Sequence, residues 1–351
     1  MADKIKFRKI KKDIEKALAL YVGKLDAAHY LKEISPVLSS SIKNFLARKG
    51  KRVRPILFVI GYLGYAGKKK RGLYESAVAF ELLHDFMLIH DDIIDKSDLR
   101  RGLPSMHRLL EKRIPISKKA KFSGSDLAIV AGDIVYAMAV DAFLSIDEDP
   151  RRKEKALKRF AESVLFTGGG EFIELLGGLK DIKKVTKDDI YKIYDLKTAN
   201  YTFSSPLSIG ALLAGAPKAE IHNLFTYGTY LGRAFQIKDD ILDMFGDEKK
   251  TGKPQLTDLK ESKKTILLWR AYHSSSPSDR KAIRDVLASE NPAKKELMRI
   301  RAIVSSSGAL QYAKKEVSCF LRKAERSSAS LTMRPRYRKL LDSYCKDLLN
   351  I

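Results

Sequence analysis

The sequence is poor in cysteine and has no long uninterrupted apolar run. These two features argue against a disulfide-rich or cysteine-ligated metal protein and against a transmembrane helix. Its 351 residues include two cysteines, Cys319 and Cys345. Two widely separated thiols are too few for a disulfide framework or a cysteine metal site, so we interpret both as structural thiols in a reducing compartment. The longest apolar stretches, PILFVIGYLGYAG and PLSIGALLAGA, contain glycine and are shorter than the roughly 18 residues that span a bilayer. The sequence therefore predicts a globular protein without a transmembrane helix.

Acidic residues are scarce relative to basic ones. The chain has 67 lysines and arginines against 43 aspartates and glutamates, a formal net charge of +24 at pH 7. This excess predicts anionic partners and permits weak association with an anionic membrane surface. No recognised nucleic-acid-binding module surrounds the basic residues, so we expect no nucleic acid partner. The basic N-terminal segment contains Asp3, Asp13 and Glu15 and no cleavable apolar core, so we expect a cytoplasmic protein.

Convincing strand patterns are absent from the sequence. Apolar residues instead recur every three or four positions, as in amphipathic helices. Two such stripes comprise Ala79, Leu82, Phe86, Ile89 and Ile93, and Leu231, Phe235, Leu242 and Phe245. Segments 64–72, 114–125, 246–252 and 274–278 have the glycine, proline or polar composition of loops. With no change of composition along the chain, we expect one all-α domain over residues 1–351, a bundle of about ten or more helices.

Two acidic motifs interrupt these apolar helices. Both read Asp-Asp-x-x-Asp, one within IHDDIIDK and the other within IKDDILDM. Their members are Asp91, Asp92 and Asp95 in the first motif, and Asp239, Asp240 and Asp243 in the second. The outer carboxylates of each motif are four residues apart, so they share a helix face and repel one another. A single motif of this kind is usually a solvated acidic surface, but two of them on apolar helices indicate a cation that offsets the repulsion.

The chemistry of these motifs favours Mg²⁺ over other cations. All candidate ligands are carboxylate oxygens, without cysteine or histidine among them. Magnesium prefers oxygen ligands, usually takes one or two carboxylates, and fills its other positions with water and substrate phosphates. We therefore expect Mg²⁺, with Mn²⁺ as a substitute. If the two motifs face one another, they enclose a metal-bound diphosphate.

Basic residues accompany both motifs. Lys51 and Arg54 precede a proline that suits the start of a helix, where an anion is favoured. Arginine forks and lysine ammonium groups are common binders of phosphate oxygens. The other basic candidates are Arg100, Arg101, Lys253 and Lys263. His84 lies two helical turns before the first motif and on the same face, whereas we interpret His90 as structural. The alternative for these cations is an ordinary basic loop.

The order and spacing of these motifs resemble the trans-isoprenyl diphosphate synthase family, which includes farnesyl and geranylgeranyl diphosphate synthases. The resemblance extends from about Ile42 to the C-terminal helix and rests on GKRVRP, DDIID, LRRGLP, FQIKDDILD and DLKESKKT, together with the Lys197-Thr198 pair. It implies the isoprenoid synthase fold, an all-α bundle around a central cavity. It also implies a prenyltransferase that condenses isopentenyl diphosphate with dimethylallyl, geranyl or farnesyl diphosphate, and a homodimer.

The resemblance also implies roles for individual residues. The isopentenyl diphosphate is expected to bind Lys51, Arg54, His84 and Arg101. The allylic diphosphate is expected to bind Arg100, Lys197, Thr198, Gln236, Lys253 and Lys263. The Mg²⁺ ligands are expected among the two aspartate motifs, with Asp91, Asp95 and Asp239 foremost. The dipoles of Lys197, Thr198 and Gln236 are expected to stabilise the allylic cation, which gives these three residues a catalytic role.

Two stretches depart from the family pattern. Where the family commonly has Gly-Gln-x-x-Asp, this chain has Gly170, Glu171 and Glu174. Ser262 replaces the glycine that usually precedes the last lysine. Because Glu174 keeps a carboxylate, these departures affect the local geometry of the expected site rather than the expected activity.

Residues before the first aspartate motif bear on product length. Phe86 lies five residues before Asp91, about 7.5 Å along a helix axis. A chain anchored at the motif would reach Phe86, which we expect to act as a floor. One aromatic here, followed by Met87, resembles archaeal geranylgeranyl diphosphate synthases and predicts a C20 product. The alternatives are a C15 farnesyl product and a Phe86 that is simply part of the core.

Three other functions compete with this one. A class I terpene cyclase shares the fold and the first motif, but it generally lacks the second motif and needs no isopentenyl site. A non-catalytic partner subunit tends to lose a motif, and both are present here. A basic surface-binding protein would show salt-dependent retention without turnover of allylic diphosphates.

Overall fold

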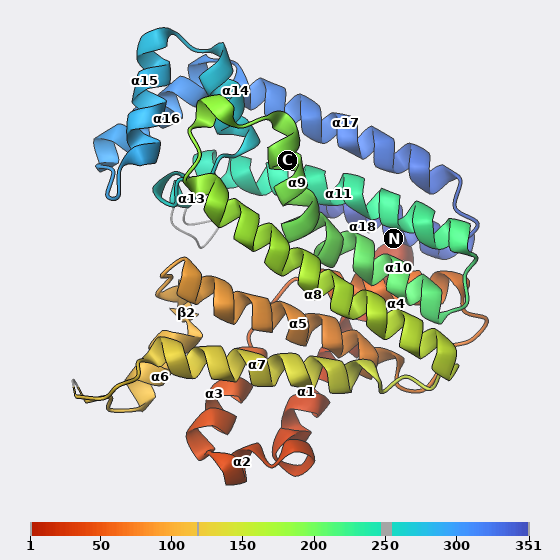
Figure 1. Cartoon of the computed structure of the whole chain (residues 1–351). Helices are drawn as coiled ribbons and strands as arrows, with labels where there is room; N and C mark the ends of the chain where they lie inside the picture. Colours follow the sequence, from red (N-terminus) through yellow and green to blue (C-terminus); the bar gives the residue numbers. More distant parts are fainter. Residues whose placement is uncertain (1, 118, 247–254, 350–351) are drawn as a thin grey trace. The chain divides into compact units, whose positions relative to one another are not determined.

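The computed structural model describes residues 2–117, 119–246 and 255–349, which are almost entirely helical (Figure 1). This confirms the all-α class. The chain forms two compact units, a first unit of Met1–Leu157 and Ile209–Ala216, and a second unit of Lys158–Ser208 and Pro217–Ile351. Within the described ranges, none of the helices has the length and apolar character needed to cross a membrane. The single-domain organisation stays a prediction.

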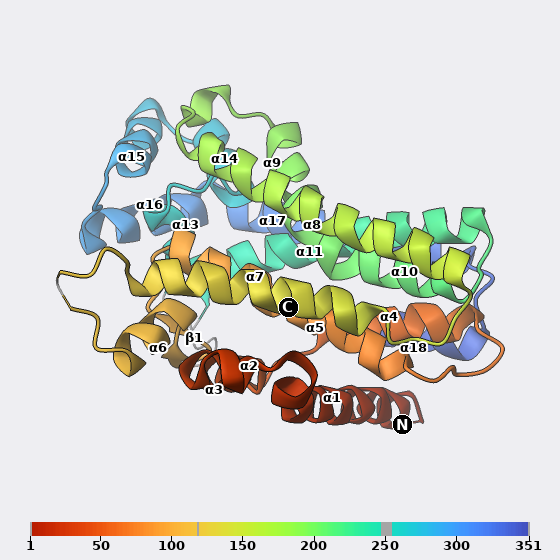
Figure 2. The same cartoon turned by 60° about the horizontal axis from the view of Figure 1, so that its bottom comes forward.

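The first unit is built around α5, which is buried along most of its length. Its elements are α1 (Ala2–His29), α2 (Leu31–Ile34), α3 (Pro36–Leu46), α4 (Val53–Tyr65), α5 (Leu73–Ile94), β1 (Leu99–Arg100), β2 (Leu103–Pro104), α6 (Met106–Arg113), α7 (Gly124–Phe143) and the start of α8 (Pro150–Gly178). Helices α1, α4 and α7 all pack against α5, and α7 runs beside it in both views (Figures 1 and 2). Phe80 packs against Phe58 and Phe143 in this core, with ring centroids 4.8 and 6.2 Å apart. The core thus fixes the helix that carries the first aspartate motif.

A minimal β-hairpin follows α5 and was not predicted from the sequence. Strands β1 and β2 pair antiparallel, with Leu99 opposite Pro104 and Arg100 opposite Leu103. The two residues of the turn, Arg101 and Gly102, have φ angles of 57° and 75°. Positive φ at both central positions is the geometry of tight hairpin turns. The hairpin thereby fixes two consecutive arginines just after the first aspartate motif.

The second unit contains the rest of the chain. Its elements are the remainder of α8, η1 (Ile182–Lys184), α9 (Lys187–Tyr194), η2 (Asp195–Ser204), α10 (Ser205–Leu213, whose last residues belong to the first unit), α11 (Lys218–Phe245), α13 (Thr257–Lys260), α14 (Ile266–Ser274), α15 (Pro277–Ala288), α16 (Lys294–Ser306), α17 (Ala309–Ala329) and α18 (Pro335–Leu349). Helix α11 lies between α17 and η2. It carries the second aspartate motif.

Element η2 is a ten-residue π-helix held in place by glycines of its neighbours. A Cβ at Gly232 of α11 would lie inside van der Waals distance of Ala199, and one at Gly228 would do the same at Ser204. A Cβ at Gly170 of α8 would lie 2.7 Å from the Lys197 backbone nitrogen. Long π-helical segments are rare and occur often at functional sites. These close contacts fix η2, which carries Lys197 and Thr198.

The predicted stripes and loops largely match these elements. The stripe within 79–93 lies on α5 and the stripe within 231–245 on α11, although Leu242 is 38% exposed. Three of the predicted loops coincide with gaps between helices, after α4, α6 and α14. Most of the fourth predicted loop, 246–252, lies outside the described residues.

The close contact between α11 and η2 predicts a large difference between two Gly→Ala substitutions. Gly232→Ala should lower the free energy of unfolding by about 1–3 kcal/mol because the added methyl group overpacks against Ala199. Gly23→Ala, on α1, meets nothing within 4 Å and should raise stability by roughly 1 kcal/mol through helix propensity. Urea unfolding followed by circular dichroism measures both. Equal stability of the two variants would contradict the packing described here.

Candidate active site

Both aspartate motifs lie at the C-terminal ends of helices. Helix α5 ends at Ile94 with Asp95 as its C-cap, and α11 ends at Phe245, two residues after Asp243. The C-terminus of a helix carries the negative end of the helix dipole, so each carboxylate there costs about 0.3–1 kcal/mol in addition to mutual repulsion. Two placements of this kind oppose helix stability and favour a bound cation.

Within the first motif, the three carboxylates have different surroundings. Asp92 is buried, and its Oδ1 accepts a 2.7 Å hydrogen bond from Arg100 Nε and another from the same guanidinium. The pKa of Asp92 is nevertheless raised, mainly by burial. Asp91 and Asp95 are only half-buried. Arg100 thus pairs with Asp92, while Asp91 and Asp95 lie closer to solvent.

His84 lies among arginines, as the sequence predicted for a diphosphate site. The pKa of His84 is held well below its usual value, first by burial and then by the positive charges of Arg54, Arg101, Arg100 and Arg52. The imidazole is therefore neutral at pH 7. The structure thus brings together His84, Arg54 and Arg101, three of the four residues expected to bind isopentenyl diphosphate; the fourth, Lys51, is exposed.

A buried ion-pair network beneath this site was missed by sequence reasoning. Arg52, within GKRVRP, is 2% exposed and donates to Glu81, which is also 2% exposed, and to Glu15 at 3.0 Å. Arg101 lies 3.9 Å from the same Glu81 carboxylate. The signal available in the sequence was a glutamate inside the apolar run of α5. Its position three residues before His84 suggests that the network orients the basic residues of the site.

Asp85 is a second buried carboxyl that sequence reasoning missed. It is 2% exposed, and its Oδ2 has no hydrogen-bond partner among the described residues. Burial raises the pKa of Asp85 well above its usual range, and the neighbouring Glu81 carboxylate raises it further. Glu81, Asp85 and Asp92 fall on one face of α5. The interior face of this helix is therefore acidic, and arginines surround it.

In the second unit, the second motif is held by a chain of hydrogen bonds. Thr198 Oγ1 donates to Gln236 Oε1 at 2.6 Å, and Gln236 Nε2 donates to Asp240 Oδ1 at 2.9 Å. The hydroxyl of Tyr194 donates to the other oxygen of Asp240 and accepts a 3.0 Å bond from the Ile266 amide. Burial raises the pKa of Asp240 to about 7. Thr198 and Gln236, two of the three residues predicted to be catalytic, are in contact, and Tyr194 is an addition that the sequence did not reveal.

Asp243 contacts the start of α13. Its Oδ1 accepts from the Thr257 amide at 3.1 Å and from the Thr257 hydroxyl, and its Oδ2 accepts from the Asp258 amide at 3.2 Å. A carboxylate that accepts from the first amides of a helix acts as an N-cap. Asp239 is half-buried and lies on the same helix. Both oxygens of Asp240 and of Asp243 therefore already accept hydrogen bonds.

Lys197 of η2 lies between two carboxylates of α8. Its Nζ is 2.5 Å from Glu174 Oε2 and also pairs with Glu171. These glutamates occupy the stretch that departs from the family pattern. Lys263 Nζ pairs with Glu261 at 2.5 Å, and Lys253 lies outside the described residues. The structure thus places Lys197 and Lys263, both predicted to bind the allylic diphosphate, in ion pairs with carboxylates.

Phe86 packs against two aromatic rings of the first unit. Its ring centroid is 5.2 Å from Tyr136 of α7 and 4.7 Å from His90. Phe86 and Met87 are both half-buried. The contact with Tyr136 fixes the Phe86 ring one and a half turns before the first motif.

The carboxylates fit a magnesium site that is completed by substrate. Among the described residues, no three histidine, cysteine, aspartate or glutamate side chains converge into a ready-made metal cage. Magnesium does not need one, because water and phosphate oxygens commonly fill most of its positions. The buried Oδ2 of Asp92 has no hydrogen-bond partner in the described part of the chain. An unmet acceptor next to Asp91 suits a metal-bound water.

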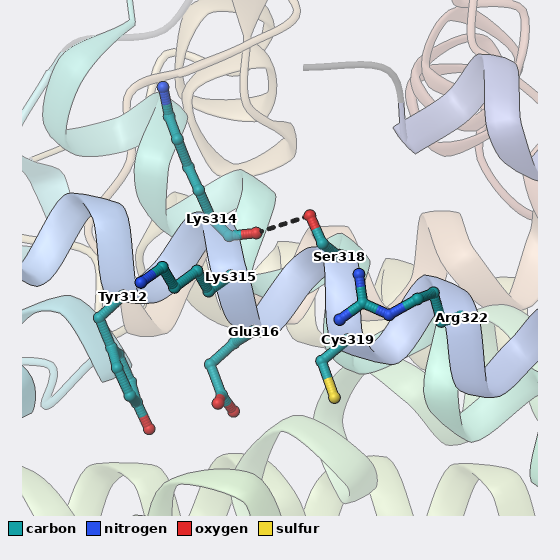
Figure 3. Close-up of a pocket in the computed structure, with 7 residues that line it drawn as sticks. All are labelled: Tyr312, Lys314, Lys315, Glu316, Ser318, Cys319 and Arg322. Carbon is teal, nitrogen blue, oxygen red and sulfur yellow. Dashed lines mark hydrogen bonds between the residues drawn. The ribbon is translucent and has the colours of Figure 1, made fainter.

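A hollow of about 590 Å³ lies elsewhere in the second unit, along α17. Tyr312, Glu316 and Cys319 line it, and Glu316 and Cys319 project to the same side of the helix (Figure 3). Glu316 already accepts from the Tyr191 hydroxyl and lies 3.0 Å from Lys187 Nζ. None of the predicted site residues lines this hollow, and we assign it no role in the site.

The buried Arg52–Glu81 pair makes a quantitative prediction. Glu81→Gln leaves the buried guanidinium without its main counter-charge and should lower the free energy of unfolding by about 3–5 kcal/mol. The double variant Arg52→Met with Glu81→Leu removes both charges and should be markedly more stable than the single variant. Asp98→Asn, in the exposed pair with Arg108, should change stability by less than about 1 kcal/mol. Guanidinium unfolding measures all three, and a double variant less stable than Glu81→Gln would refute the pairing.

Comparison with known proteins agrees with this geometry. The family model for polyprenyl synthetase matches residues 35–304. A geranylgeranyl diphosphate synthase of Sulfolobus acidocaldarius is 33% identical over 277 residues, which cover 78% of this chain and 79% of that protein. A farnesyl diphosphate synthase of Bacillus subtilis is 32% identical over 262 residues, covering 73% and 80%.

A solved structure agrees in fold along nearly the whole chain. Geranylgeranyl pyrophosphate synthase from Corynebacterium glutamicum, complexed with isoprenyl diphosphate and magnesium, matches with a TM-score of 0.87 at 25% identity, covering 97% of this chain and 98% of that one. The resemblance noted in the sequence is thereby confirmed. The chain belongs to the polyprenyl synthetase family and is a prenyltransferase that makes short-chain prenyl diphosphates.

Proposed function

We propose that this prenyltransferase is a geranylgeranyl diphosphate synthase, which joins isopentenyl diphosphate to allylic diphosphates until the product has twenty carbons. The observation that carries the proposal is the placement of both aspartate motifs in the last turns of α5 and α11, where the helix dipole disfavours carboxylates and a bound cation would offset that cost. The magnesium and isoprenyl diphosphate in the Corynebacterium structure support the same chemistry for this chain.

The six aspartates divide into two groups in this proposal. Asp91, Asp95 and Asp239 hold Mg²⁺, as the family resemblance implies, while Asp92, Asp240 and Asp243 accept hydrogen bonds from other groups of the protein. Asp92 orients Arg100, Asp240 orients Gln236, and Asp243 fixes the start of α13. Magnesium supplies positive charge that stabilises the diphosphate leaving group as the carbon–oxygen bond breaks.

The basic residues bind the two substrates in this proposal. Lys51, Arg54, His84 and Arg101 bind isopentenyl diphosphate, and a neutral His84 donates a hydrogen bond without adding charge. Arg100, Lys197, Lys253 and Lys263 bind the allylic diphosphate. Lys197 exchanges a carboxylate of Glu171 or Glu174 for a phosphate oxygen, while the Thr198–Gln236 pair directs its dipoles at the allylic cation. The departing diphosphate accepts the proton that is lost after the new carbon–carbon bond forms.

A metal-dependence experiment tests this function. With isopentenyl diphosphate and dimethylallyl, geranyl or farnesyl diphosphate, the enzyme should form prenyl diphosphates with Mg²⁺ or Mn²⁺ and none in chelator. Asp91→Asn and Asp239→Asn should lower turnover by about 100-fold or more, because leaving-group stabilisation is lost. Asp285→Asn, an exposed carboxylate on α15, is the matched control. Full activity in chelator, or a cyclised hydrocarbon as product, would refute the proposal.

The product lengths of the relatives differ, because they include a geranylgeranyl (C20) and a farnesyl (C15) diphosphate synthase. Phe86 supports a C20 product for this chain. If Phe86 is the floor of the chain cavity, Phe86→Ala should extend the product past C20 by about one prenyl unit. Met87→Phe should shorten it toward C15. A core phenylalanine replaced by alanine costs about 3–5 kcal/mol without changing the product. Mass spectrometry measures the chain length of the products. A destabilised Phe86→Ala enzyme whose product keeps the wild-type length would refute the proposal that Phe86 limits elongation.

We also propose that the enzyme is a homodimer that uses α8. Within the second unit, one face of α8 exposes Leu165, Phe172 and Leu176 by 69, 64 and 50%, and Leu179, just after the end of α8, is 86% exposed. The spacing of seven and four residues between the three helical positions places them on one stripe. An apolar stripe of this kind is typical of a protein–protein contact, and a second copy of the chain is the occupant that the family resemblance implies.

Charge placed in this stripe should dissociate the dimer. Phe172→Glu should sediment as a monomer at micromolar concentration because a carboxylate would be buried without a partner. Met298→Glu, on α16 and 43% exposed, should leave the dimer intact. Analytical ultracentrifugation measures both. A wild-type monomer, or an undisturbed Phe172→Glu dimer, would contradict this interface.

A further inference from the structure

The outward face of α1 is cationic between Arg8 and Ala28, where none of the exposed residues is acidic. Between Arg8 and Ala28, its exposed residues are Arg8, Lys9, Lys12, Lys16, Ala19, Leu20, Gly23, Lys24, Ala27 and Ala28. Arg8, Lys12, Lys16, Leu20 and Lys24 follow one another at four-residue intervals and form one stripe, about 24 Å long at 1.5 Å per residue. We call the ten exposed residues the α1 face.

Two acids of the same helix, Glu15 and Asp26, contact residues of other segments. Glu15 accepts from Arg52 at 3.0 Å, and Asp26 accepts from Ser39 at 2.5 Å and pairs with Lys43. The apolar side of α1 is buried, with Ile14 and Leu25 fully covered, and packs against α5 and α4 (Figure 2). Between Arg8 and Ala28, Glu15 and Asp26 are thus in ion pairs with other segments and Asp13 is half-buried, whereas five of the basic residues are exposed.

Apolar side chains accompany these cations. Leu20 lies within the stripe and is 53% exposed, and Tyr30, just beyond the end of α1, is 60% exposed. Exposed cations accompanied by exposed leucine and tyrosine are characteristic of helices that lie in a membrane interface, where lysines meet anionic head groups and apolar residues enter the acyl boundary. A nucleic acid partner would be served by cations alone and gives no reason for Leu20.

We propose that the α1 face docks the protein on an anionic lipid surface. Each lysine or arginine near such a surface contributes attraction that falls off within a Debye length, and five cations are available on the α1 face. Leu20 adds a short-range apolar contact. None of these residues belongs to the proposed active site, so the inference stands independently of the proposed activity, and it gives part of the excess positive charge a physical role.

Vesicle flotation with the full-length protein tests the proposal. Wild type should bind phosphatidylglycerol–phosphatidylcholine vesicles at low ionic strength, bind phosphatidylcholine alone weakly, and dissociate in high salt. The triple variant Lys9→Gln, Lys12→Gln and Lys16→Gln should bind the anionic vesicles on the order of 100-fold more weakly. Leu20→Gln should weaken binding several-fold.

A second triple variant separates the α1 face from net charge. Lys294→Gln, Lys295→Gln and Arg299→Gln remove the same charge from exposed positions on α16, and this variant should bind vesicles as wild type does. Prenyltransfer without vesicles should be unchanged in both triple variants, which shows that they fold. Equal losses in the two triple variants, or wild type that binds duplex DNA but not anionic vesicles, would overturn the proposal.

Discussion

Carboxylates at the negative ends of two helix dipoles are the constraint on which the site depends. Asp91 and Asp95 end α5, and Asp239 lies in the last turns of α11. Protein groups stabilise two of the neighbouring carboxylates: Arg100 pairs with Asp92, and Gln236 donates a hydrogen bond to Asp240. In the proposed mechanism, magnesium diphosphate adds compensating charge at Asp91, Asp95 and Asp239. A family of enzymes that ionise diphosphates is expected to have this arrangement.

Close helix packing determines the positions of the side chains that surround the two aspartate motifs. Gly170 and Gly232 bring α8 and α11 so near to η2 that Lys197 and Thr198 have fixed positions beside Glu174 and Gln236. In the first unit, the Arg52–Glu81 pair and the tight turn at Arg101 place the arginines around His84. Helix packing thus determines which side chains can meet a diphosphate.

The sequence predicted what depends on local pattern. Helices α5 and α11 follow from apolar periodicity, and like charges four residues apart on them reveal the two motifs. It did not reveal the partners of Arg52 or Tyr194, because Glu15, Glu81, Asp240 and Ile266 are distant along the chain and only tertiary packing brings them near. Asp85 next to His84 was visible, but its burial depends on α5 being covered on most sides. The hairpin after α5 was not predicted because its two-residue strands are too short to show a period-two pattern.

The most direct test of this account is metal binding by paired variants. Manganese bound in the presence of inorganic diphosphate can be measured by electron paramagnetic resonance for Asp239→Asn and Asp240→Asn. We expect Asp239→Asn to lose the bound metal, because its carboxylate is a ligand. Asp240→Asn should retain the metal but unfold more easily, because Tyr194 and Gln236 lose a charged acceptor. Loss of metal from Asp240→Asn with full retention by Asp239→Asn would contradict the account.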